Sequence, residues 1–272
     1  MSTPSDRRAH ILQQISTGEI IAVSDLANAL EVSEMTIRRD LGELEKEGLL
    51  RRVHGGAVST FGRSYEPPFT LRNAQASSAK DGIARLAASL VSEGESVALD
   101  VGTTVVEVAR HLSKRRGLTI VTPSLKAVEH FMSNKDVRVI VAGGIMRSGE
   151  ASLVGELAFA TFRTLFVDKL FLGVGGINAE AGLTDYNWDD AMVKKEMIRS
   201  AREIIVTADS SKFGRTAFAK VAELDAVSAI ITDSAPPDDL CELFEQKNIA
   251  LHIADQCDPC VEQQQTIMSD QE

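Results

Sequence analysis

The fold class of this chain follows from one run of residues, Ser96-Val97-Ala98-Leu99-Asp100-Val101-Gly102-Thr103-Thr104. The run begins as an apolar strand pattern, turns at its glycine and leads into a helix pattern over 105–112. The alternation continues along the chain, with strands predicted at 119–121, 137–142, 169–174, 203–208 and 229–232, and helices at 83–91, 125–132, 189–201 and 237–247. Strands that alternate with helices of about ten residues predict an α/β fold with a mostly parallel sheet covered by helices.

Polar and glycine-rich segments follow several of these strands. Open α/β sheets bind ligands beyond the carboxyl ends of their strands, and free amides at a helix N-terminus bind anions. We therefore expect a ligand site near Asp100 and Gly102, with Lys212 as a cation suited to phosphate. The glycines at 173–177 do not fit a dinucleotide motif, and close packing of the backbone explains them as well as a ligand does.

The first 60 residues or so have a different pattern. Helices are predicted at 6–16, 25–30 and 34–47, with Ser24 and Ser33 as N-caps of the second and third. A hairpin pattern follows at 49–59, around His54-Gly55-Gly56. Two short helices around a tight turn, followed by a hairpin, are typical of a winged helix-turn-helix.

The third helix divides into two faces. At about 100° per residue, Ile37, Leu41 and Leu44 form one buried stripe, and the remaining side chains point away. A recognition helix needs this division, and a guanidinium can hold guanine through two hydrogen bonds. Paired arginines on a solvated surface helix have the same pattern. The candidate DNA-contacting residues are Ser33, Met35, Thr36, Arg38, Arg39, Arg51, Arg52 and His54.

Composition limits the function. The 272 residues include 29 Lys and Arg against 39 Asp and Glu, a formal net charge of -10, and 5% aromatics. The acidic balance argues against coating nucleic acid by bulk charge, and the few aromatics argue against a base-stacking platform. Residues 1–60 hold seven basic and nine acidic side chains, so any basic DNA-contacting cluster is local.

We expect neither a membrane-spanning helix nor a metal site. No apolar run approaches the roughly 20 residues of a membrane helix, and the polar start has no signal core, which favours the cytoplasm. Cys241 lies alone in a helical stretch, and Cys257 and Cys260 lie in a polar tail without a second Cys/His pair. We expect no cofactor.

Two sets of motifs go beyond these patterns. The first comprises Val32-Ser33-Glu34-Met35-Thr36-Ile37-Arg38-Arg39-Asp40-Leu41, Gly48-Leu49-Leu50-Arg51-Arg52 and His54-Gly55-Gly56-Ala57. The second comprises Asp100-Val101-Gly102-Thr103-Thr104, Gly143-Gly144, Gly182-Leu183-Thr184-Asp185, Lys194-Lys195 and Asp209-Ser210-Ser211-Lys212-Phe213-Gly214. Together they resemble the DeoR family of bacterial transcription regulators over residues 4–255.

The resemblance implies a DNA-binding winged helix-turn-helix at 4–59, a linker at 60–79, a sugar-phosphate sensor domain at 80–255 and a polar tail at 256–272. It implies a sensor fold related to ribose-phosphate isomerases. The implied function is transcription regulation, most often repression, of a carbohydrate operon. The implied partners are double-stranded operator DNA, a phosphorylated sugar effector and further copies of the chain in a homodimer or homotetramer.

The resemblance also places the effector-binding residues. Phosphate or nearby hydroxyls are assigned to Gly102, Thr103, Thr104 and Lys212, and sugar hydroxyls to Asp100, Thr122, Ser124 and Asp209. Gly175, Asp185, Tyr186, Lys194, Lys195 and Ser211 complete the set. Pro123 stands where many members have Asn.

Two other functions stay open. One is a sugar-phosphate isomerase that carries a DNA-binding domain, although no spacing singles out a general base among Asp100, Asp185 and Glu196. The other is an interaction module with an unused pocket. We expect a regulator and no enzyme, and the sugar stays open among pentose, hexose, amino-sugar, polyol and glycerol phosphates.

Overall fold

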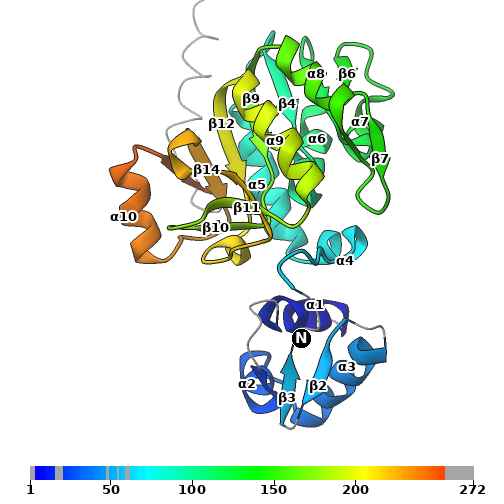
Figure 1. The fold of residues 1–272 in the computed structure, drawn as a ribbon, viewed down its shortest axis with the longest axis vertical. Helices are drawn as coiled ribbons and strands as arrows, with labels where there is room; N and C mark the ends of the chain where they lie inside the picture. The colour runs from blue at the N-terminus through cyan, green and yellow to red at the C-terminus, as the bar shows by residue number, and fades with distance from the viewer. Residues whose placement is uncertain (1–3, 16–20, 47–48, 54, 59–61, 255–272) are drawn as a thin grey trace, which may run out of the picture.

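The computed structural model describes residues 4–15, 21–46, 49–53, 55–58 and 62–254. Figure 1 shows a small part built from the N-terminal residues and a larger α/β part. His54, Cys257 and Cys260 lie outside the described residues. Within the described ranges, no helix is long and apolar enough to cross a membrane.

The small part is a helix-turn-helix with a short sheet, as predicted. Its helices are α1 (Pro4–Ile15), α2 (Val23–Ala29) and α3 (Glu34–Lys46), and its antiparallel strands, in the order β1-β3-β2, are β1 (Ile21–Ala22), β3 (Gly56–Val58) and β2 (Arg51–Val53). Ser33 caps α3, because its hydroxyl accepts a hydrogen bond from Thr36 N at 3.2 Å. The prediction of Ser24 as a cap was wrong. Ala22 pairs with β3 and is itself the N-cap, so α2 begins at Val23, two residues earlier than predicted.

The larger part is built on a sheet of seven parallel strands, counted within the described residues. In sheet order the strands are β15 (Ala250–Ile253), β14 (Ala229–Thr232), β12 (Ala201–Thr207), β9 (Val167–Leu172), β4 (Ser96–Leu99), β5 (Thr119–Thr122) and β6 (Arg138–Val141). The prediction of a mostly parallel sheet is confirmed.

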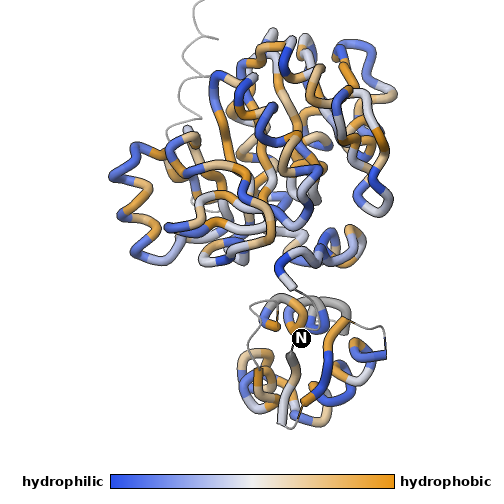
Figure 2. Tube along the Cα trace, in the orientation of Figure 1, coloured by the Kyte–Doolittle hydropathy of each residue, from blue (hydrophilic) through white to orange (hydrophobic). Residues whose placement is uncertain are grey.

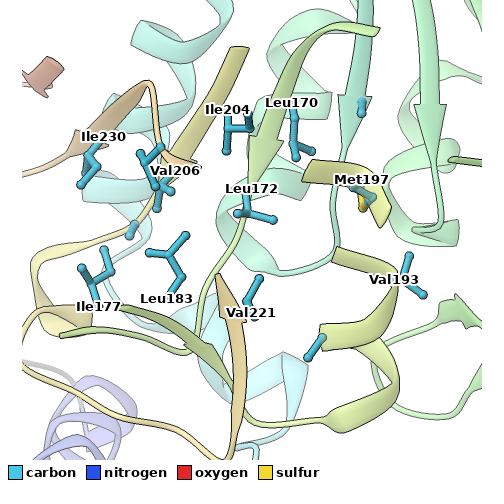
Figure 3. Packing of buried hydrophobic residues seen from close by; sticks show 14 of the residues in the cluster. Leu170, Leu172, Ile177, Leu183, Val193, Met197, Ile204, Val206, Val221 and Ile230 are labelled. Atoms are coloured by element: carbon cyan, nitrogen blue, oxygen red, sulfur yellow. The ribbon is translucent and has the colours of Figure 1, made fainter. Parts of the chain in front are cut away.

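Helices cover both faces of this sheet, so its strands are apolar on both sides. Phe171 of β9 points toward the face covered by α5 (Ser77–Ser89), α6 (Thr103–Leu112) and α7 (Leu125–Phe131). Its neighbours Leu170 and Leu172 point toward the face covered by α8 (Glu156–Thr164), α9 (Trp188–Ser200) and α10 (Asp238–Gln246). Figure 3 shows Leu170 and Leu172 near Met197 of α9, and Figure 2 shows apolar residues along the strands.

The order of the strands places a crevice between β4 and β9. From β4 the chain proceeds outward through β5 and β6, and from β9 it proceeds in the opposite direction through β12, β14 and β15. Neighbouring parallel strands whose connections run in opposite directions leave an opening at their carboxyl ends, and ligands bind there. Asp100 follows β4 at this point, and Gly173 follows β9.

Short elements that the sequence patterns did not predict surround this crevice. They are the hairpin of β7 (Ile145–Arg147) and β8 (Ser152–Val154), and a small sheet in the order β10-β11-β13. Those strands are β10 (Gly176–Asn178), β11 (Gly182–Asp185) and β13 (Ala219–Ala222). A Cβ on Gly176 would lie 2.4 Å from the carbonyl oxygen of Arg215, so backbone packing requires that glycine.

A helix of six residues, α4 (Phe69–Ala74), lies in the segment that we interpreted as a linker. It contacts both α1 and α6. Leu71 packs against the apolar core of the small part, which includes Ile11 and Ile37. The next helix, α5, begins at Ser77. The second half of the segment is therefore mostly helical, and α4 touches both parts of the molecule.

Candidate functional site

A cleft opens at the crevice between β4 and β9. Its walls come from the β4–α6 turn, the ends of β9 and β12, the small sheet, α9 and the segment 66–80. The lining residues are Glu66, Arg72, Gln75, Lys80, Val101, Gly102, Thr103, Thr104, Glu150, Gly173, Val174, Asp185, Tyr186, Asp190, Lys194, Thr207, Ala208, Asp209 and Lys212.

The N-terminus of α6 forms one wall of the cleft. Gly102 is its N-cap, with φ 112° and ψ 158°, a conformation open to glycine and strained for other residues. Thr103 and Thr104 begin the ten-residue helix, whose first-turn amides have no partner within the helix itself. Free amides and the positive end of a helix dipole make this wall suitable for an anion.

A buried ion pair supports the floor of the cleft. The ammonium of Lys194 contacts the Asp100 carboxylate, lies 3.0 Å from Asp185 Oδ2 and donates to the Gly173 carbonyl oxygen at 2.9 Å. Burial raises the pKa of Asp100, and the Lys194 charge opposes that shift. Burial would lower the pKa of Lys194, but Asp100 and Asp185 together raise it. The group joins the ends of β4, β9 and β11 to α9.

Cations also line the cleft. Lys80 is 3% exposed and donates to the carbonyl oxygen of Gln75 at 2.6 Å. Burial lowers its pKa to about 8, and repulsion from Lys212 and Arg72 adds to that shift, whereas Asp209 opposes it. Burial raises the pKa of Asp209, but the charges of Lys212 and Lys80 help to bring it below its ordinary value. This cluster of like charges would be relieved by a bound anion.

Alternating acidic and basic side chains form a network at the cleft. Arg72 Nη2 lies 2.9 Å from Glu66 Oε1 and also contacts the Glu150 carboxylate. Arg147 Nη2 lies 2.9 Å from Glu66 Oε2 and contacts the Asp190 carboxylate. The network connects the segment before α4 with the β7–β8 hairpin and α9.

Most of the predicted effector-binding residues line this cleft. They are Gly102, Thr103, Thr104, Asp185, Tyr186, Lys194, Asp209 and Lys212. Asp100 is fully buried behind them, where it also accepts a hydrogen bond from Gly173 N at 2.9 Å. Ser211 stands beside the cleft, and its amide donates to Asp209 Oδ1.

The other predicted residues lie outside the lining. Thr122 donates to the Leu99 carbonyl oxygen at 2.6 Å, and Ser124 caps α7 by accepting from Ala127 N. Gly175 packs against Tyr186, whose ring would lie 3.1 Å from an added Cβ. Lys195 lies over the ring of Trp188.

Several lining residues were not predicted, namely Glu66, Arg72, Gln75, Lys80, Glu150 and Asp190. One of them has a signal in the sequence. Lys80 stands at helical spacing from Ile83, Ala84 and Ala87, all buried on one face of α5. A lysine on an apolar stripe indicates a charge held inside the protein. The segment around Glu66 and Arg72 has no such periodicity.

The outer face of α3 has the division that we predicted. Ile37, Leu41 and Leu44 are buried, whereas Met35 is 75% exposed and the Arg39 side chain is 82% exposed. A shallow concavity covers this face, lined by Arg7, Arg8, Met35, Thr36, Arg38, Arg39, Asp40, Glu43 and Arg52. Arg38 pairs with Glu34 at 3.0 Å, and Arg51 and Arg52 are exposed on β2.

A buried pair that the sequence did not suggest fixes α1 against this helix. Asp40 is 3% exposed, and its carboxylate lies 2.5 Å from Arg7 Nε. The pair joins α1 to α3 next to the exposed arginines.

Comparison with known proteins identifies both parts. The family model of the DeoR C terminal sensor domain matches residues 75–234, and that of the DeoR-like helix-turn-helix domain matches residues 7–61. The glycerol-3-phosphate regulon repressor of Escherichia coli is 30% identical, over 92% of this chain and 98% of its own length. YulB of Bacillus subtilis, an uncharacterized HTH-type transcriptional regulator, is 36% identical, over 90% of this chain and 95% of its own. The structure of ribose 5-phosphate isomerase A from Methanocaldococcus jannaschii matches over 49% of this chain and 53% of its own chain, with 19% sequence identity and a TM-score of 0.37.

Proposed function

Because this chain belongs to the DeoR family, we propose that it represses a carbohydrate operon and that a phosphorylated sugar controls its affinity for operator DNA. One observation carries the proposal. Lys80, Lys212 and the N-terminus of α6 line one cleft at the strand switch point. A phosphate dianion placed there meets helix amides and two ammonium groups, and it relieves the repulsion between Lys80 and Lys212.

Carboxylates supply the rest of the site. Asp185, Asp190 and Asp209 also line the cleft. Ionised carboxylates only accept hydrogen bonds, and sugar hydroxyls donate them. A ligand with a phosphate at one end and hydroxyls at the other complements both groups.

An isomerase is the second candidate, and the candidate bases argue against it. Asp100 is enclosed by Lys194 behind the lining, and Glu196 pairs with Arg163 and Arg199 away from the cleft. Asp185 lines the cleft, but it is held by Lys194 and accepts a hydrogen bond from its neighbour's amide. A general base needs a free lone pair within reach of substrate. None of these three carboxylates offers one.

The exposed face of α3 is the proposed DNA-contacting surface. Arg38 and Arg39 project from it, and Arg51 and Arg52 project from the adjacent strand. Helices of this motif place their N-terminal side chains against base edges while flanking cations contact phosphates. We assign base contact to Arg39 and phosphate contact to Arg52.

We further infer a homo-oligomer, since operators of helix-turn-helix proteins are commonly symmetric. Exposed apolar side chains lie around the edge strand β6, at Val141, Ile145, Met146 and Leu157. A second copy that covers them would remove an exposed apolar surface and an unpaired strand edge. Sedimentation of the Leu157→Glu variant tests this, and an unchanged mass would reject this surface as the interface.

The experiment for the whole proposal is DNA binding with and without sugar phosphates. We expect the purified protein to prefer DNA from upstream of its own gene over random DNA at matched salt. One member of a panel of pentose, hexose, amino-sugar and glycerol phosphates should change that affinity by about 5–150-fold. Lys212→Met should abolish the response, and Lys220→Met, at an exposed lysine paired with Glu223, should retain it. Equal affinity for both DNAs would refute the proposal.

A further inference from the structure

Glu150 has an unusual position in the wall of the cleft. It follows β7 in the β7–β8 hairpin, is 4% exposed and lines the cleft. One carboxylate oxygen, Oε2, contacts the guanidinium of Arg72. The other oxygen, Oε1, is buried and has no hydrogen-bond partner among the residues that the structure describes.

Such an oxygen calls for a donor from outside the chain. Buried polar atoms in native proteins are almost always hydrogen-bonded, and leaving one unpaired is costly. Because Glu150 borders the cleft, a bound molecule can reach Oε1 where the protein itself supplies no donor.

The surrounding charges decide what kind of group this donor is. Glu66 and Asp190 line the cleft together with Glu150, and the paired Arg72 and Arg147 offset their charge. A phosphate would meet like charge at Glu150 Oε1, so it belongs at the α6 end of the cleft. A hydroxyl group can donate to Oε1 without that repulsion.

We propose that Glu150 determines the specificity of the effector site by accepting a hydrogen bond, through Oε1, from a hydroxyl group of the phosphorylated sugar. Arg72 acts as a positioning residue that holds the carboxylate through Oε2. This inference rests on the proposed function, because it assigns one end of the same ligand. It adds an acceptor that neither the sequence motifs nor the strand ends suggest.

The test compares Glu150→Gln with the wild type. An amide has one oxygen, and Arg72 attracts it, so the NH₂ group would face the ligand where an acceptor is needed. Calorimetry uses the panel member that binds wild type, its deoxy analogues and inorganic phosphate. We expect Glu150→Gln to weaken sugar-phosphate binding by about 5–150-fold, the range for one unmet buried acceptor, and to leave inorganic phosphate binding within about twofold.

The deoxy analogues identify the hydroxyl. Removing the contacted hydroxyl should weaken binding to the wild type by a similar factor and should have little further effect on Glu150→Gln, because the two changes delete one contact. Glu156→Gln, at an exposed glutamate paired with Arg163, is the matched control and should bind as the wild type does. The deoxy analogues still test for the contacted hydroxyl on the wild type, even if the Glu150→Gln variant fails to fold.

The outcomes separate the two proposals. If Glu150→Gln binds the sugar phosphate as tightly as the wild type does, only the assignment of Glu150 is refuted, and the proposed function stands. That result would indicate that a water molecule donates to Oε1. An equal loss of inorganic phosphate binding also refutes it, since Glu150 would then only support the fold. If the wild type binds no phosphorylated sugar, the proposed function fails, and the assignment of Glu150 fails with it.

Discussion

Raising the pH from 7 to 9 is expected to weaken effector binding about tenfold, because Lys80 loses its proton in that interval. Burial lowers the pKa of Lys80 to about 8, helped by Lys212 and Arg72 and opposed by Asp209 and Glu107. About nine-tenths of the Lys80 side chains are charged at pH 7, and about one-tenth at pH 9. If the phosphate binds the charged form, this tenfold change corresponds to about 1.4 kcal/mol.

The charge of the ligand's phosphate changes little between pH 7 and 9, since the second ionisation of a phosphate ester lies near pH 6. Calorimetry at several pH values, with the sugar phosphate from the panel that binds, measures how the affinity depends on pH. Lys80→Met should bind weakly with a flat pH profile, which separates Lys80 from every other titrating group. A wild-type affinity that is equal at both pH values would refute the assignment of Lys80 to the phosphate. Folding stability without ligand has the opposite pH dependence, because it rises as the pH increases. The unfolded lysine binds its proton more tightly, so the cost of the buried charge to folding is full below about pH 8 and fades above it.

Other substitutions test the remaining parts of the molecule. Arg39→Ala should relax the sequence preference, whereas Arg52→Ala should weaken binding to all DNA alike and reduce the slope of log affinity against log salt concentration by about 1. Anisotropy titrations at several salt concentrations measure both effects. Equal loss of specificity in both variants would contradict these roles. Lys194→Met leaves Asp100 and Asp185 without their shared cation in a buried site. We expect it to destabilise the fold by about 3–5 kcal/mol in chemical denaturation, and an unchanged midpoint would show that the ion pair is dispensable.

The centre of the sheet was predictable because its strands are buried on both faces. Val97 and Leu99 pack on one side and Ala98 on the other, which produces a continuous apolar run. The small sheet was not predictable. Its strands are three or four residues long and include Gly176 and Gly182, so their pairing depends on contacts distant in sequence.

The candidate site divides in the same way. Gly102 and Lys212 could be predicted because the ends of parallel strands meet at one edge of the sheet. Thr122 is the last residue of β5, but β5 stands one place away from the switch point, and the Thr122 hydroxyl donates to the Leu99 carbonyl oxygen of β4. Arg72 and Glu150 reach the cleft from segments without periodic pattern, and only the packed tertiary structure brings them there.

Leu71 and Arg72 are consecutive residues of α4, yet Leu71 packs against the core of the DNA-contacting part and Arg72 lines the cleft. Consecutive Cα atoms are about 3.8 Å apart, so the backbone at one residue cannot shift without moving the other. Coupling between binding sites is reciprocal. Operator DNA therefore acts on the sugar site as strongly as the sugar acts on the operator site. Copies of the repressor seated on DNA and copies free in solution would respond to different concentrations of the same metabolite.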